Sequence, residues 1–188
     1  MQEDVDHTLW KCFITGDDGA LNLLYRKFID TLYSFGNRFT DDQELVKDAI
    51  QDLFVDLHKY RKTLSQSVNV KSYLLTSLKR KVSLLLRKKA AEQNRIYASS
   101  FSLETSMEDQ HLQDDQQSEL LSKLRRKVNL LPARQKEALY LRFNSELEYE
   151  EIAVIMDVSL STCRTLVYRG VKQLREMMII KHVYKVLA

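Results

Sequence analysis

Basic and hydroxyl-bearing side chains share one face of the segment LSTCRTLVYRGVKQLR (160–175). At helical spacing this outer face collects Arg164, Thr165, Tyr168, Arg169, Lys172 and Arg175, so every formal charge on it is positive. Arginine and lysine bind phosphates or the edge of guanine, and threonine and tyrosine donate hydrogen bonds to phosphate oxygens. The chemistry that this face suits is recognition of a nucleic acid.

A second helix is expected just before this segment, with a tight turn between the two. Residues 157–160 form the turn, and Ser161 is the expected N-cap of the second helix. Apolar stripes predict which faces are buried: Tyr149, Ile152, Ala153 and Met156 in the first helix, and Cys163, Val167, Gly170, Val171 and Leu174 in the second. This is the layout of a helix-turn-helix that lays its second helix in the major groove. From the helical wheel alone, an ordinary amphipathic helix with a solvated basic face is an equal alternative.

Composition predicts a helical protein of the cytoplasm without catalytic, metal or cofactor sites. The 188 residues include one proline and four glycines, and no apolar run approaches the roughly 18 residues of a membrane span. The acidic start of the chain lacks a signal-peptide core, and Cys12 and Cys163 lie far apart in apolar stripes. The histidines show no metal-ligand spacing, and neither a glycine-rich phosphate loop nor a nucleophile–base pair is present in the sequence.

The charge pattern divides the chain into three segments. Residues 1–90 carry 15 Lys and Arg against 12 Asp and Glu, residues 91–118 carry 1 against 6, and residues 119–188 carry 13 against 8. Two basic helical blocks with nucleic-acid partners are therefore expected on either side of an acidic linker. As flexible coil, a 28-residue linker reaches roughly 30 Å.

The first block is expected to be a helical bundle. Helices are predicted at 9–14, ended by Gly16, then from Asp17 or Asp18, and again from Asp41 and Asp42. The predicted core positions are Ala20, Leu21, Leu24, Tyr25 and Phe28, followed by Val46, Ile50, Leu53, Phe54 and Leu57. The opposite face of the later helix shows Asp48, Gln51, Asp52, Val55 and Lys59. Val55 is an apolar residue on this acidic stripe, which indicates a surface for a partner.

A basic helix is predicted over residues 70–89. Tyr73, Leu74, Ser77, Leu78 and Leu85 can face the bundle, whereas the expected exposed side is Thr76, Lys79, Arg80, Ser83 and Arg87. An aromatic ring beside basic residues permits base stacking together with phosphate contacts, as in proteins that bind single strands.

In order and spacing, motifs across both blocks resemble those of extracytoplasmic-function sigma factors, the small transcription initiation factors of bacteria. The first block contains Gly16, Asp17, Ala20, Leu24 and Tyr25, then the run 48–54 (DAIQDLF), then Ser72, Tyr73, Leu74 and Thr76. The second block contains Leu131-Pro132, the run 141–143 (LRF), and Leu147, Tyr149, Glu151, Ile152, Ala153, Ser159, Thr162, Arg164, Arg169 and Leu174. The fold implied is all-α, with a region 2 bundle and a region 4 helix-turn-helix joined by the acidic linker.

The resemblance also implies roles for individual residues. Asp48, Gln51, Asp52 and Val55 would dock on core RNA polymerase. The loop 61–69 and the helix after it would recognise and help to open the minus-10 promoter element, through Tyr73, Thr76, Lys79, Arg80 and Arg87. The helix-turn-helix would read the minus-35 element through Thr162, Arg164, Thr165, Tyr168, Arg169 and Lys172. Promoter DNA, core polymerase and an anti-sigma factor are the partners implied, with no insertion into a membrane.

Some positions depart from the family pattern. Arg80, Leu84 and Leu166 replace an Asn, an Asp and an Arg common in the family, and Glu146 and Asp157 replace glycines. Aspartate tolerates left-handed backbone better than most residues, so the turn at Asp157 is expected to survive. The apolar tail after Arg175 is expected to pack on the second domain, with docking elsewhere in the chain or on an anti-sigma partner as the alternative.

Two other functions are compatible with parts of the sequence. A stand-alone helix-turn-helix regulator that binds duplex DNA as a dimer would explain residues 119–188 but leaves the stripe 48–55 and the basic helix without a role. A polymerase-binding adaptor that no longer reads DNA is disfavoured by the basic face of 164–175.

Overall fold

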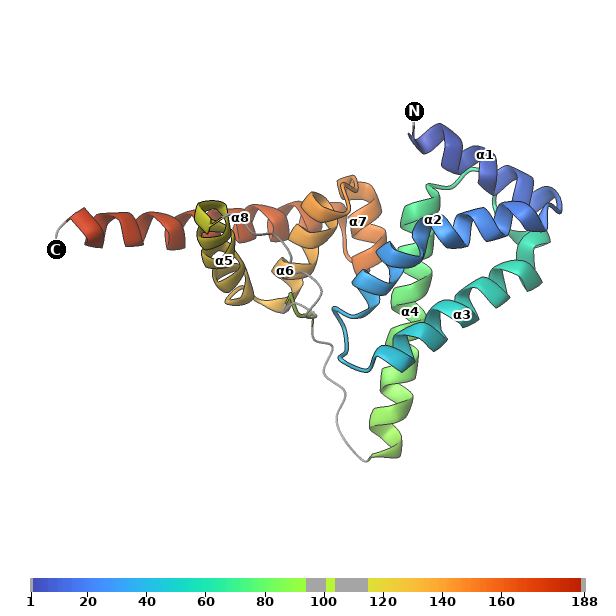
Figure 1. The fold of residues 1–188 in the computed structure, drawn as a ribbon, viewed down its shortest axis with the longest axis horizontal. Coiled ribbons are helices and arrows are strands. Elements are labelled where there is room, and N and C mark those ends of the chain that lie inside the picture. Colours follow the sequence, from blue (N-terminus) through green and yellow to red (C-terminus); the bar gives the residue numbers. More distant parts are fainter. Residues whose placement is uncertain (1, 94–100, 104–114, 187–188) are drawn as a thin grey trace. The chain divides into compact units, whose positions relative to one another are not determined.

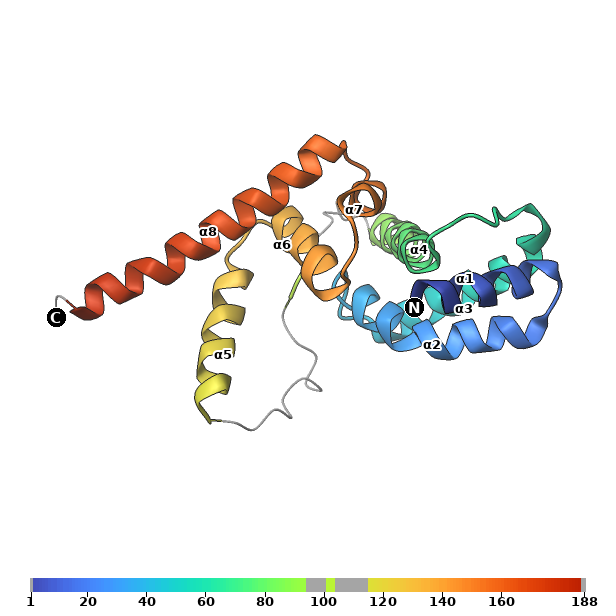
Figure 2. The same ribbon diagram turned by 90° about the horizontal axis from the view of Figure 1, so that it is seen from above.

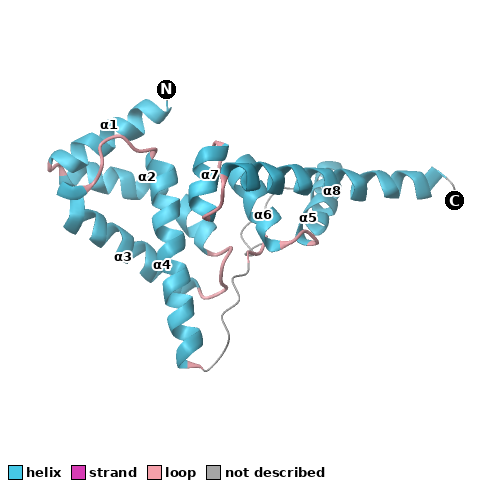
Figure 3. Cartoon of the chain, turned by 180° about the vertical axis from the view of Figure 1, so that it is seen from behind, coloured by secondary structure: helices cyan, strands magenta, loops and turns pink. Residues whose placement is uncertain are grey.

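The computed structural model describes residues 2–93, 101–103 and 115–186, with side chains for 5–93, 101–103 and 122–178. It divides into two compact units, Met1–Ser99 and Ser100–Ala188. Every regular element of the described residues is helical, which confirms the predicted all-α fold with two small helical domains (Figure 3).

The described residues of the first unit form a bundle of four α-helices. They are α1 (Gln2–Thr15), α2 (Asp18–Gly36), α3 (Gln43–Tyr60) and α4 (Val70–Glu92), with the 3-10 turn η1 (Arg61–Thr63) after α3 (Figure 1). α4 packs against the other three helices. The largest fully buried side chains of this unit are Trp10, Phe13, Leu24, Leu32, Phe35, Ile50, Leu74, Leu75 and Leu78.

Short-range signals fix the helix ends of this unit, largely as predicted. Gly16 follows α1 with φ +116°, a left-handed value that glycine adopts without strain. The Asp17 carboxylate accepts hydrogen bonds from the amides of Gly19 (2.8 Å) and Ala20 (3.2 Å), and Asp42 likewise caps α3. The first helix, however, begins well before the predicted residue 9.

The second unit contains the predicted helix-turn-helix. Its elements are α5 (Asp115–Asn129), α6 (Ala133–Leu139), a π-helical turn η3 (Tyr140–Asn144), α7 (Tyr149–Met156) and α8 (Leu160–Val186). α8 packs on α6 and α7 through its first half, as Figure 2 shows. The Lys127 ammonium donates to the carbonyl of Met177, which ties α5 to α8.

Among the described residues, helices reach into both ends of the predicted acidic linker 91–118, and one buried aromatic residue lies between them. Helix α4 continues to Glu92, and α5 already begins at Asp115. Phe101 is buried and its ring lies 5.6 Å from that of Tyr140 in the second unit. This aromatic contact could not be predicted, because the scattered apolar residues of 91–118 show no periodicity. Residues 94–100 and 104–114 lie outside the described part of the chain.

The apolar tail continues α8 to Val186 as a helix. Met177 and Met178 are half-buried. The side chains from Ile179 onward, on which its predicted packing depends, lie outside those described.

Candidate nucleic-acid interface and docking surface

The turn of the helix-turn-helix is built on a left-handed aspartate, as predicted. Asp157 ends α7 with φ 53° and ψ 57°, and the amide of Val158 donates back to the carbonyl of Ala153 (3.0 Å). The Arg134 guanidinium of α6 donates to the Met156 carbonyl at the same helix end (2.8 Å). The other replaced glycine, Glu146, is left-handed too, with φ 56°. Both positions keep the backbone conformation that glycine usually supplies.

Ser159, not Ser161, caps the second helix. The Ser159 hydroxyl accepts from the Thr162 amide (3.1 Å) and lies 2.8 Å from the Thr162 hydroxyl. The helix consequently starts at Leu160, two residues before the start that a cap at Ser161 would give. The Thr165 hydroxyl donates to the carbonyl of Ser161 (2.8 Å). Both threonine hydroxyls therefore already have partners within the helix start.

The outer face of α8 is exposed as predicted. All six residues predicted to read the minus-35 element are exposed: Thr162, Arg164, Thr165, Tyr168, Arg169 and Lys172. On the opposite side Cys163, Val167 and Gly170 are buried, whereas Val171 and Leu174 are half-buried. Burial raises the pKa of the Cys163 thiol, the nearby Glu150 carboxylate adds to this rise, and Arg164 opposes it. This thiol is therefore a protonated core group, in agreement with the predicted burial of Cys163.

The predicted exposed face of α4 is only partly exposed. Arg80 and Arg87 are exposed, and Lys79 is half-buried with its ammonium 5.8 Å from the centre of the Phe39 ring. Thr76 was predicted on the exposed side but is buried, with its hydroxyl donating to the Ser72 carbonyl (2.8 Å). The reason for this error is that α4 contacts three helices, so more of its circumference is covered than a two-sided wheel assumes.

Helix α1 holds the loop that precedes α4. The indole nitrogen of Trp10 donates to the Ser65 carbonyl (2.9 Å), and the His7 ring lies 3.1 Å from the Gln66 carbonyl. The Trp10 ring also lies 5.3 Å from that of Tyr73, which is half-buried at the start of α4. No pattern in the sequence predicts these contacts, because they join residues more than 50 positions apart.

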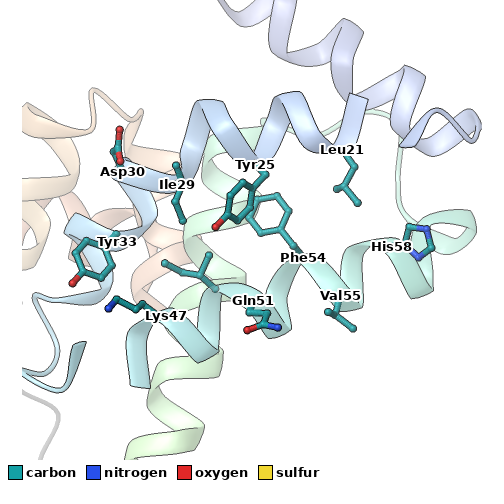
Figure 4. Close-up of a pocket in the computed structure, with 11 residues that line it drawn as sticks. Leu21, Tyr25, Ile29, Asp30, Tyr33, Lys47, Gln51, Phe54, Val55 and His58 are labelled. Atoms are coloured by element: carbon teal, nitrogen blue, oxygen red, sulfur yellow. The ribbon is translucent and has the colours of Figure 1, made fainter. Parts of the chain in front are cut away.

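The acidic stripe of α3 borders an apolar groove between α2 and α3. Asp48, Gln51, Asp52 and Val55 are all exposed, Val55 by 56%. Gln51 and Val55 line a groove of about 760 Å³ together with Leu21 and Tyr25 of α2 (Figure 4). The Tyr25 ring stands edge-on to Phe54 at 5.0 Å and is itself 42% exposed. The prediction of Leu21 and Tyr25 as core residues is wrong: Leu21 is half-buried and Tyr25 is exposed, and both line the groove beside Val55.

A polar hollow lies on the other side of the stripe. Asp48, Gln51 and Asp52 line it from α3, and Lys88 and Lys89 line it from α4. The Lys89 ammonium donates to the Asp42 carboxylate (2.6 Å), and this hydrogen bond lowers the pKa of Asp42. Gln51 lines both the groove and the hollow. The carboxylates of Asp48 and Asp52 on α3 therefore lie between the apolar groove on one side and the lysines of α4 on the other.

The described part of the chain offers neither a metal site nor a membrane-spanning helix. No group of three or more His, Cys, Asp or Glu side chains there could hold a metal ion. None of the helices described is both long and apolar enough to cross a membrane.

Two family models match the chain over both units. Residues 24–92 match sigma-70 region 2, and residues 121–174 match sigma-70 region 4. The chain belongs to the sigma-70 family. It is a sigma factor, a transcription initiation factor whose partners are core RNA polymerase and promoter DNA. The family predicted from the motifs is thus confirmed, and the two-region architecture agrees with the extracytoplasmic-function group.

Solved structures share the fold of this sigma factor. One is the sigma factor RpoE in complex with the anti-sigma factor NepR from Bartonella quintana, at 22% identity, 85% coverage of this chain, 96% of that chain and a TM-score of 0.60. Another is CnrH in complex with the cytosolic domain of CnrY, at 15% identity, 93% and 97% coverage and a TM-score of 0.59. A comparison with curated proteins finds no match.

Proposed function

We propose that this sigma factor directs core RNA polymerase to promoters by reading two elements, minus-35 with its second unit and minus-10 with its first. The observation that carries the proposal is the outer face of α8. Arg164, Arg169 and Lys172 are exposed on the helix that follows the left-handed turn, and the apolar side of the same helix is buried. A helix presented in this way suits insertion into a major groove, where Arg reads guanine and Lys neutralises phosphate.

The minus-10 element is proposed to contact the loop 61–69 and the start and exposed side of α4. Tyr73, Lys79, Arg80 and Arg87 remain the candidates, with the aromatic ring for stacking and the cations for phosphates. Burial of Thr76 removes it from direct contact with DNA, and its hydrogen bond to Ser72 gives it a structural role instead. Trp10, through its bond to the Ser65 carbonyl, would keep the loop in position.

Docking on polymerase is proposed for the stripe Asp48, Gln51, Asp52 and Val55 together with the adjoining groove. Carboxylates steer a basic partner during encounter. The exposed Val55 and Tyr25 and the half-buried Leu21 supply apolar area that slows dissociation of the complex. An anti-sigma factor is a further proposed partner, because the RpoE structure with the same fold is a complex with one. The proposed location, with polymerase and promoter DNA, is the bacterial cytoplasm.

Transcription in vitro tests the proposal. Core polymerase with the full chain is expected to start from specific sites in a genomic DNA library, whereas the chain alone binds the same duplexes weakly. Val55→Glu should lower initiation from all promoters alike, because it places a charge in the docking surface. Arg169→Ala should lower it more on some minus-35 sequences than on others. Tight binding of the chain alone to paired half-sites, without initiation, would support the stand-alone regulator instead.

A further inference from the structure

A small cluster of charged and aromatic residues surrounds the first arginine of the recognition helix. The Arg164 guanidinium lies 3.6 Å from the Glu150 carboxylate and 5.8 Å from the centre of the Tyr149 ring. Glu150 and Tyr149 belong to the start of α7, whereas Arg164 belongs to the first turns of α8. The side chains of Arg164 and Glu150 are 60% and 64% exposed, so the pair lies on the surface that would face DNA.

The Tyr149 ring that contacts Arg164 is itself held in place by neighbouring residues. Arg142 packs on the same Tyr149 ring at 4.9 Å, and its guanidinium donates to the Leu147 carbonyl (2.7 Å) and contacts the Glu148 carboxylate (3.1 Å). The Glu151 side chain accepts from the Glu148 amide (2.9 Å), which closes a capping box at the start of α7. Tyr149 is half-buried within this network. The Tyr149 ring and the start of α7, which contact Arg164, are therefore better ordered than a free surface side chain.

A carboxylate at this position does not help the chain to bind DNA in general. Glu150 repels phosphates, and its partial neutralisation of Arg164 weakens attraction that does not depend on sequence. Guanidinium has five N–H donors in a planar fork, however, and its nearest approach to Glu150 is the 3.6 Å between Nη2 and Oε1. The remaining donors can bind the O6 and N7 atoms of guanine. Holding the fork in one plane favours a bidentate partner over a lone phosphate oxygen.

We propose that Glu150 and Tyr149 are positioning residues that orient Arg164 toward a guanine edge in the minus-35 element, raising selectivity at the expense of overall affinity. The inference rests on the proposed role of α8 in reading that element. An isolated exposed ion pair contributes little to stability. We assign the ion pair between Glu150 and Arg164 a different role. It restricts the Arg164 side chain, which would otherwise sample many rotamers, to one conformation.

A double-mutant cycle in the assembled holoenzyme tests the proposal. The probe is a pool of promoter duplexes with a randomised minus-35 hexamer. A preferred sequence is first selected with the wild-type holoenzyme. Templates with that sequence, and with single-base substitutions of it, are then transcribed with each variant. We expect Glu150→Gln to lower the preference for the selected base at one position about fivefold while total initiation stays equal or rises. In an Arg164→Ala background the same change should alter that preference less than twofold, since there is no guanidinium left to orient.

Further variants distinguish the positioning of Arg164 from the effect of negative charge and from loss of folding. Tyr149→Phe retains the ring face and should retain base preference, whereas Tyr149→Leu removes it and should behave like Glu150→Gln. Glu176→Gln removes one negative charge further along α8 and should raise initiation on all templates without changing base preference. Thermal unfolding of each variant shows whether the unit remains folded at the assay temperature.

The outcomes distinguish this inference from the function on which it rests. A loss of base preference in Arg164→Ala, with no change in Glu150→Gln, would overturn the positioning role and leave the proposed function intact. An Arg164→Ala variant with unaltered base preference would overturn the reading role of Arg164 and the inference together. Equal effects of Glu150→Gln with and without Arg164 would show that Glu150 acts only through its charge.

Discussion

Gly36 lies at a close approach between α2 and α3, and it allows a quantitative test of the first unit's packing. A Cβ atom at this position would lie 2.5 Å from Cγ1 and 3.5 Å from Cγ2 of Val46. Ordinary carbon contacts are about 3.5–4.0 Å, so the two helices would have to separate by about 1 Å. Val46 is completely buried and its β-branched side chain has one strongly preferred rotamer in a helix. Rotation of its methyl groups therefore cannot relieve the clash.

The expected effect of Gly36→Ala follows from two opposing contributions. Overpacking of a core costs about 1–3 kcal/mol, while alanine gains at most about 1 kcal/mol over glycine in a helix. The gain is smaller here because Gly36 is the last residue of α2. We therefore expect a net loss of about 1–2 kcal/mol, which lowers the melting temperature of a unit of this size by several degrees.

Trp10 provides an assay that reports this unit alone. It is the single tryptophan of the chain and is completely buried in the first unit. Denaturant unfolding followed by its fluorescence should shift to lower midpoints in Gly36→Ala. Gly170→Ala, which places a Cβ 2.9 Å from Cδ1 of Leu139 in the second unit, should leave the Trp10 transition unchanged.

A second substitution separates the steric clash from other causes. Val46→Ala removes the two methyl carbons, so the Gly36→Ala, Val46→Ala double variant should be less destabilised than the sum of the single variants by about 1 kcal/mol or more. If Gly36→Ala stabilises the unit, or if the two changes are simply additive, the close approach of α2 and α3 at this point is refuted.

Three further predictions concern other parts of the chain. Phe101→Ala should destabilise the second unit by about 3 kcal/mol, because it empties a buried aromatic site against Tyr140; circular dichroism should record this while the Trp10 transition stays fixed. Glu146→Gly should stabilise the second unit by up to about 1 kcal/mol and Asp157→Gly by less, since both residues are left-handed but aspartate tolerates that backbone better; a larger gain at Asp157 would contradict this ranking. The lowered pKa of Asp42 means that its pair with Lys89 stabilises the fold above the ordinary carboxyl pKa of about 3.9 and that this contribution is lost as pH falls through the lower folded pKa; Lys89→Met should reduce the acid dependence of the Trp10 midpoint.

Features set by a few neighbouring residues were predictable from the sequence. Asp17 and Asp42 cap helices through amides two or three residues away, and Gly16 ends α1 through its own backbone freedom. The exposed face of α8 was predictable for the same reason, because a helix at the edge of a small domain has one buried side and one solvated side. The motifs across both units then identified the sigma-70 family.

The tertiary structure decided what depends on contacts between distant segments. Thr76 is buried because three helices surround α4, and Phe101 becomes a core residue because its ring meets Tyr140, 39 positions further along the chain. The groove beside Val55 exists only where α2 lies against α3. The support of Arg164 by Glu150 and Tyr149 arises from the crossing of α7 and α8. Sequence periodicity describes one helix at a time, and so it determines which face of a helix is apolar but not which neighbour covers it.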